Sequence, residues 1–125
     1  MTLNEIKINY EAEEISIEEP ILLININNLY HKKITDKEMY EAIRKSWRID
    51  LNRVKNIKIA CSIYKGIIRE VFIIEGWNDA NENGRKEFFG KKAHDEIRNK
   101  YIDKSVKSYW KQGSQNPIKY ANPKL

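Results

Sequence analysis

Two β-branched segments joined by a two-residue turn occupy the middle of the chain. From Ile57 to Tyr64, isoleucines and one cysteine alternate with other residues, which is typical of a strand with one buried face. Lys65-Gly66 supplies the turn, and Ile67 to Glu75 returns as a second strand. Strict alternation would place Arg69, Val71 and Ile73 on one face of that strand and Ile68, Glu70, Phe72 and Ile74 on the other. The sequence therefore predicts a β-hairpin at the centre of the fold.

A strand and a helix are predicted before the hairpin. The run from Ile21 to Ile26 is almost entirely apolar and of strand length, and Asn27-Asn28 closes it. Thr35 and Glu38 match a capping box, in which each side chain satisfies a free backbone amide of the first helical turn. Apolar residues then recur at helical spacing, so we expect a helix from Asp36 to Trp47.

Shorter elements are predicted in the second half of the chain. Glu75-Gly76-Trp77 is expected to leave the sheet, and Glu87 to Phe89 to form a short strand that Gly90 stops. Asp103 is a candidate N-cap for a helix from Lys104 to Gln112, and the proline-containing tail should be extended. With the elements above, this pattern predicts an α+β fold, in which a small mixed or antiparallel sheet centred on the hairpin is packed by two helices.

Length and composition favour a single domain outside a membrane. With 125 residues, of which 41% are hydrophobic, the chain can bury one core. No apolar run approaches the roughly 18 to 20 residues that span a bilayer, and the single cysteine, Cys61, cannot form an internal disulfide. We therefore expect a cytoplasmic protein with an acidic N-terminal arm or edge strand at 1–19 and one binding domain at 20–125.

Charge is distributed unevenly along the chain. The net charge is −5 over the first thirty residues and +5 over the whole chain, so the remaining residues carry +10. Tryptophan, phenylalanine and tyrosine are interspersed among the lysines and arginines of this basic part. Because cations neutralise phosphate and aromatic rings accept bases or sugars, a nucleotide or a nucleic acid is the expected partner.

Few residues of the sequence suggest an active site. His31 and His94 lie far apart and match no zinc-ligand spacing, and Cys61 alternates with isoleucines as a small buried residue does. We therefore expect a protein without enzymatic activity, metal or cofactor. Carboxylates that only the fold would bring together, such as Glu70 with Glu87, remain the route by which a cryptic nuclease could arise.

The C-terminal half also resembles a known domain type. The resemblance depends on Arg85, Phe88-x-Gly90, Ala93, Tyr101-Ile102-x-Lys104-Ser105-Val106 and Gln115-Asn116-Pro117-Ile118-x-Tyr120. This pattern looks like an uncharacterised small α+β domain of prokaryotic and phage proteins, sometimes found beside GIY-YIG nuclease domains, and it is similar by fold analogy to PUA-like nucleic-acid modules. The chain departs from the pattern at Lys86, where the pattern favours tryptophan, and it has no nuclease motif of its own.

The residues predicted to contact the ligand are cations, aromatic rings and amides. The phosphate partners are Arg48, Arg53, Arg69, Arg85 and Lys86, the stacking surfaces are Trp77 and Phe88, and the amides that could read a base edge are Gln115 and Asn116. Arg69 is the strongest positional hint, because a guanidinium inside an apolar strand must reach solvent or meet an anion.

These observations predict non-enzymatic binding of a phosphate-bearing ligand. A concrete form is a phage-type anti-defence protein that sequesters a nucleotide second messenger. The alternative is a protein interaction module, in which the acidic arm engages a second copy of the chain or another basic protein. A nuclease accessory or cryptic nuclease domain is the third hypothesis.

Overall fold

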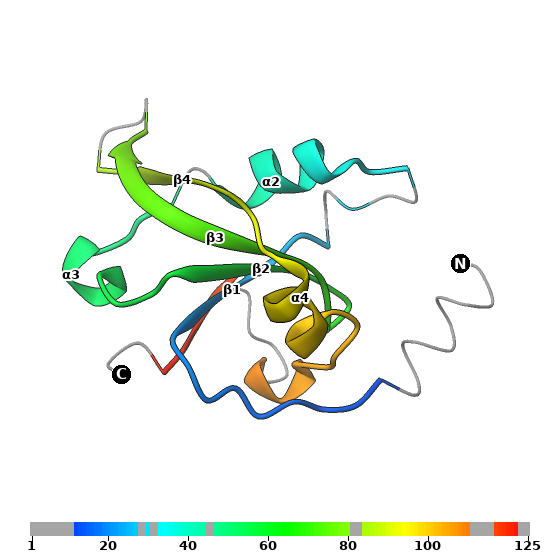
Figure 1. Ribbon diagram of the computed structural model, residues 1–125. Coiled ribbons are helices and arrows are strands. Elements are labelled where there is room, and N and C mark those ends of the chain that lie inside the picture. Colours follow the sequence, from blue (N-terminus) through cyan, green and yellow to red (C-terminus); the bar gives the residue numbers. More distant parts are fainter. Residues whose placement is uncertain are drawn as a thin grey trace.

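A five-stranded sheet in the order β4-β3-β2-β1-β5 forms the centre of the computed structural model (Figure 1). The structure describes residues 12–27, 30, 33–44, 47–80, 84–110 and 117–122. The strands are β1 (Ile21–Asn25), β2 (Ile59–Tyr64), β3 (Ile67–Asp79), β4 (Lys86–Lys92) and β5 (Ile118–Ala121). β1 and β2 are parallel and all other neighbours are antiparallel, so the predicted α+β fold with a mixed sheet is confirmed.

Both faces of the sheet are covered. The crossover from β1 to β2 contains α2 (Asp36–Arg44) and α3 (Leu51–Val54), which contribute Met39, Ile43 and Val54 to the core on one face. The helix α4 (Asp95–Tyr101), the 3₁₀ helix η1 (Lys107–Tyr109) and the extended segment 12–20 lie on the other face (Figure 1). The interior strand β1 therefore faces a core on each side, which explains its continuous apolar run.

The predicted hairpin is confirmed as β2 and β3, with one irregularity. Lys65 and Gly66 both have positive φ, as a tight hairpin turn of this length requires. In the register, Ser62 pairs with Glu70 and Ile63 pairs with Ile68, so Arg69 is an extra residue in β3. This bulge interrupts the alternation. Ile68 consequently joins Val71 in one core, and the prediction that it shares a face with Phe72 is wrong.

The β3–β4 pair is longer than predicted. β3 continues through Gly76 and Trp77 to Asp79, so the expected departure from the sheet is wrong. Gly90 lies inside β4 and does not end it. A Cβ atom at Gly90 would lie 1.8 Å from the carbonyl oxygen of Ile73, so the close approach of the two backbones requires glycine at this position.

The predicted start of the first helix is confirmed, but α2 ends at Arg44 and not at Trp47, whose backbone pairs with Lys86; the second predicted helix is wrong. At the start of α2, Thr35 Oγ1 accepts a hydrogen bond from the Glu38 amide at 3.1 Å, and Glu38 Oε1 accepts one from the Thr35 amide at 3.3 Å. No helix begins at Lys104, because the backbone of Ser105 pairs with Glu14 and Ile67 instead. The regular helix in this part of the chain is α4, whose Tyr101 is buried.

The outer edge of β4 is covered by side chains and backbone from the α2 region. Trp47 and Lys86 exchange two backbone hydrogen bonds of 2.9 and 2.8 Å. Farther along, the Phe88 carbonyl accepts a hydrogen bond from Arg44 Nε, and the Gly90 amide donates one to the Tyr40 hydroxyl. These contacts satisfy edge groups that would otherwise be open to pairing with another strand.

The described part of the predicted acidic arm is docked on the domain. The Ile15 amide donates to the Ser105 carbonyl, and the Ser105 amide donates to the Glu13 carbonyl, at 3.0 and 2.8 Å. Ile17 is buried, and its amide donates to the Tyr109 hydroxyl at 3.0 Å. Lys104 Nζ lies 2.7 Å from the Glu13 carboxylate. The extended segment 12–20 is thus held by the C-terminal part of the domain.

Candidate functional site

Most of the predicted ligand residues lie at the far end of the β3–β4 pair. Trp77 is near the end of β3, Lys86 begins β4 and Arg85 precedes it. The Trp47–Lys86 bridge brings Arg48 to the same end of the sheet. The structure therefore gathers Arg48, Trp77, Arg85 and Lys86, which the sequence could not place relative to one another.

The chemistry of this end differs from the prediction. Phe88 is completely buried, so the expectation that its ring stacks on a ligand is wrong, and it is a core residue instead. Trp77 packs edge to face against Phe88, with 5.6 Å between ring centroids. Lys86 forms an ion pair with Asp79, which reduces its availability for a phosphate.

The remaining predicted residues are dispersed. Arg53 is exposed on α3, and its guanidinium carbon lies 4.0 Å from the centroid of the Tyr120 ring in β5. Gln115 and Asn116 lie outside the described residues. Arg69 lies eight residues before Trp77 on β3, which corresponds to roughly 26 Å along the strand. One contiguous site made of all predicted residues is therefore excluded.

The β3 bulge places Arg69 against two tyrosine rings. Tyr30, in the connection from β1 to α2, stacks on Tyr64 at the end of β2, with ring centroids 4.2 Å apart and an interplanar angle of 21°. The guanidinium carbon of Arg69 lies 5.6 Å from each centroid. We call Tyr30, Tyr64 and Arg69 the arginine–tyrosine site.

Two donors of the Arg69 guanidinium are unsatisfied. Nε and Nη2 are buried, and within the described part of the chain no acceptor contacts either of them. These two nitrogens share one edge of the planar group, and their N–H bonds are nearly parallel. Such an edge matches two oxygens of one phosphate or carboxylate group, which makes the arginine–tyrosine site suited to a bidentate oxyanion.

The carboxylate of Glu70, the next residue in β3, does not accept a hydrogen bond from the buried Nε or Nη2 of Arg69. Glu70 is buried, and its oxygens accept hydrogen bonds from Arg98 Nε at 2.7 Å and Nη2 at 3.3 Å. Lys92 Nζ lies 3.6 Å from the same carboxylate, and the Val71 amide donates to it at 3.1 Å. Hydrogen bonding to Glu70 is the main cause of the raised pKa of Arg98. Within the described residues, the Nε–Nη2 edge of Arg98 thus has an internal bidentate partner, and the same edge of Arg69 has none.

Hydrogen bonds fix the strand ends around the site. The Lys65 amide donates to Asn27 Oδ1, and the Asn27 amide donates to Asn25 Oδ1, both at 2.8 Å. Lys65 Nζ lies 5.4 Å from the Tyr64 ring centroid. The arginine–tyrosine site therefore lies where the parallel strands β1 and β2 end, and the carboxyl ends of parallel strands are a common location for ligands.

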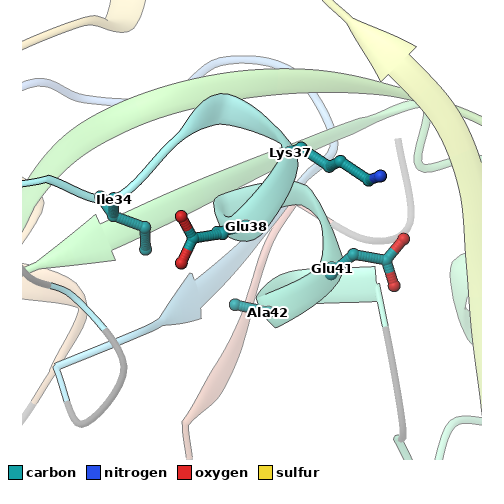
Figure 2. Close-up of a pocket in the computed structure, with 5 residues that line it drawn as sticks. All are labelled: Ile34, Lys37, Glu38, Glu41 and Ala42. Carbon is teal, nitrogen blue, oxygen red and sulfur yellow. The ribbon is translucent and has the colours of Figure 1, made fainter.

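The two described pockets lie elsewhere and are acidic. One, of about 440 Å³, follows the surface of α2, and Figure 2 shows the side chains that line it: Ile34, Lys37, Glu38, Glu41 and Ala42. The other, of about 370 Å³, is lined by residues of the 12–20 segment and α4, with two glutamates and one lysine among them. An excess of carboxylates repels phosphate, so neither pocket suits the predicted ligand.

Neither a metal-binding cluster nor a reactive cysteine is found among the described residues. Among them, no three or more histidine, cysteine, aspartate or glutamate side chains cluster so as to hold a metal ion. Cys61 is buried, and this burial raises the pKa of its thiol, which disfavours the nucleophilic thiolate. No helix in the described ranges has the length and apolar character needed to cross a membrane.

Comparisons with protein-family models, curated proteins and solved structures found no match. The resemblance to a small prokaryotic and phage domain therefore stays a prediction from sequence, and the site has to be interpreted from its own geometry. That geometry includes two residues that sequence reasoning missed, Tyr30 and Tyr64. Tyr64 carried a weak signal, since it precedes the Lys65-Gly66 turn and the strand after this turn contains an arginine. Tyr30 carried none.

Proposed function

We propose that this protein binds a phosphate-bearing ligand, a nucleotide or a nucleic acid, at the arginine–tyrosine site. The observation that carries the proposal is the pair of buried, unsatisfied donors on Arg69. A buried donor without an acceptor destabilises a fold by about 1–3 kcal/mol, and native proteins contain few of them. A bound oxyanion would supply two acceptors at once.

The surroundings of Arg69 favour phosphate as that oxyanion. The Tyr30 and Tyr64 rings lie beside the guanidinium and stack on each other, so a base could extend this stack on the outer face of either ring. Lys65 is an exposed cation at the rim. A ligand that joins a phosphate to a flat ring uses all of these features. Since the described residues bring no nucleophile and base together at Arg69, we propose binding without turnover.

The first test measures how strongly affinity depends on Arg69. The probe is a single-stranded DNA of eight nucleotides with a 5′ phosphate and a 3′ fluorescein, followed by fluorescence anisotropy. Arg69→Lys keeps the charge but loses the bidentate edge, so we expect the dissociation constant to rise about tenfold or more. Arg48→Lys, at the far end of the β3–β4 pair, is the matched control and should bind like the wild type.

The opposite pattern would overturn the proposal. If Arg48→Lys weakens binding and Arg69→Lys does not, the ligand lies at the far end of the sheet. Circular dichroism melting of both variants is measured in parallel, so that a loss of binding is assigned to the site only in folded protein.

A further inference from the structure

We infer that the arginine–tyrosine site takes a terminal phosphate, which is a phosphomonoester, and not an internal phosphodiester of a polymer. This inference rests on the proposed function and names the part of the ligand that Arg69 holds. The terminal phosphate has two possible sources, a free nucleotide or the 5′ end of a single strand.

The depth of the donors is the first reason. Nε and Nη2 of Arg69 are both buried, so an oxyanion has to enter the protein surface to reach them. An internal phosphodiester carries a sugar on each side and only two unesterified oxygens. A terminal phosphate is attached at one side only and presents three such oxygens, so it can project inward while two of them pair with the guanidinium edge.

The charges around the site are the second reason. A polymer backbone is bound by a row of cations that follows successive phosphates. Near Arg69, the described cations Lys92 and Arg98 are already paired with Glu70, and Lys92 also contacts Asp36. Lys65 lies at the rim, with its Nζ 5.4 Å from the Tyr64 ring centroid. The pairing of Lys92 and Arg98 with Glu70 makes two nearby cations less available to a ligand, which suits one phosphate group better than an extended backbone.

The two rings define where the rest of the ligand lies. The Tyr30 and Tyr64 rings lie beside the guanidinium, with each ring centroid 5.6 Å from the guanidinium carbon. A ring at this distance offers a stacking surface next to the bound phosphate. The nucleoside attached to that phosphate is within reach of this surface, which favours a base adjacent to the phosphate.

The test compares three ligands that differ at the phosphate. They are the 5′-phosphorylated eight-nucleotide probe, the same labelled strand with a 5′ hydroxyl, and unlabelled adenosine 5′-monophosphate as a competitor, with adenosine as its control. For the wild type we expect the 5′-hydroxyl strand to bind at least tenfold more weakly than the phosphorylated strand. Arg69→Lys should reduce this difference to about twofold or less, while Arg48→Lys should preserve it.

The outcomes separate this inference from the proposed function. Equal affinity for the two strands, combined with a loss of binding in Arg69→Lys, would overturn the terminal-phosphate inference and leave the proposed function standing. Binding of both strands that is unchanged in Arg69→Lys would overturn both. Displacement of the phosphorylated probe by the monophosphate but not by adenosine supports a free nucleotide. A phosphate preference without such displacement supports the end of a strand.

Discussion

Replacing Arg69 by methionine should make the unliganded protein more stable. Methionine has a similar length and no polar donor, so Arg69→Met removes Nε and Nη2 from their buried position without acceptors. Most substitutions of buried residues destabilise a protein. An increase in stability would therefore be a specific sign that the native side chain is kept for a ligand and not for the fold.

The magnitude follows from two opposing contributions. Two buried donors without acceptors destabilise the folded state by about 1–3 kcal/mol each, or about 2–6 kcal/mol together. Contacts of the cation with the Tyr30 and Tyr64 rings, at 5.6 Å each, offset about 1–2 kcal/mol of this. The expected gain in the free energy of unfolding is thus about 0–5 kcal/mol, with a central value of about 2.5 kcal/mol. For a domain of this size the central value corresponds to a rise in melting temperature of roughly 10 °C.

Urea unfolding followed by tryptophan fluorescence measures this gain, since the chain contains three tryptophans. Arg98→Met is the matched control, because it makes the same substitution at an arginine whose guanidinium is paired with the buried Glu70 carboxylate. It leaves the Glu70 carboxylate, whose side chain is 4% exposed, without its bidentate partner. Loss of one partner of a buried ion pair costs about 3–5 kcal/mol, and the Lys92 contact places the expected loss near 3 kcal/mol.

The two variants should thus change stability in opposite directions. If Arg69→Met lowers the free energy of unfolding by as much as Arg98→Met does, Arg69 has a structural role and the reasoning about its unsatisfied donors is refuted. A phosphate-bearing ligand should in addition raise the melting temperature of the wild type but not that of Arg69→Met, because binding stabilises only a protein that can bind.

Three further predictions follow from the core, the docked segment and the cysteine. Phe88→Ala should lower the free energy of unfolding by about 3–5 kcal/mol, as measured by urea unfolding; a loss below 1 kcal/mol would contradict its place in the core. The hydrogen bond and charge of Lys104 lower the pKa of Glu13, so the unfolded state binds a proton more readily, and this contribution to stability is present above about pH 4.5 and lost as the pH falls further. Glu13→Gln should flatten the dependence of the urea midpoint on pH between 6 and 3, and an unchanged slope would argue against the ion pair. Cys61 should react with a thiol reagent only at the rate of protein opening, and fast labelling under native conditions would show that it is not buried.

Local patterns in the sequence predict much of the sheet. Alternation and the Lys65-Gly66 turn identify the hairpin, and the capping box at Thr35 identifies the start of α2. The bulge at Arg69 is not predictable in this way, because it depends on how β3 pairs with β2. The helix expected from Lys104 fails for a similar reason, since Ser105 pairs with two distant segments whose positions the local sequence does not contain.

The residues of the candidate site show the same difference between local and long-range information. Arg69 could be identified from its own segment alone, because a guanidinium among apolar strand residues has to reach solvent or meet an anion. The ring of Tyr30 comes from a different connection, and only the parallel pairing of β1 with β2 brings it near Tyr64. The prediction for Phe88 is wrong because it relies on the basic residues Arg85, Lys86, Lys91 and Lys92 that flank the Phe88-Phe89 pair in the sequence, whereas the Phe88 side chain lies in the core beside Trp77.

The position of β1 between β2 and β5 also has a consequence for synthesis of the chain. One edge of β1 pairs with β2 and the other with β5, which emerges from the ribosome long after both. Until Ile118 to Ala121 are available, the nascent protein carries an unpaired apolar strand edge that can associate with other chains. Pairing over such a sequence separation also slows folding. Truncated chains that stop before residue 118 should therefore aggregate. In the full-length chain, a chaperone that binds exposed strands should delay aggregation until β5 has been synthesised.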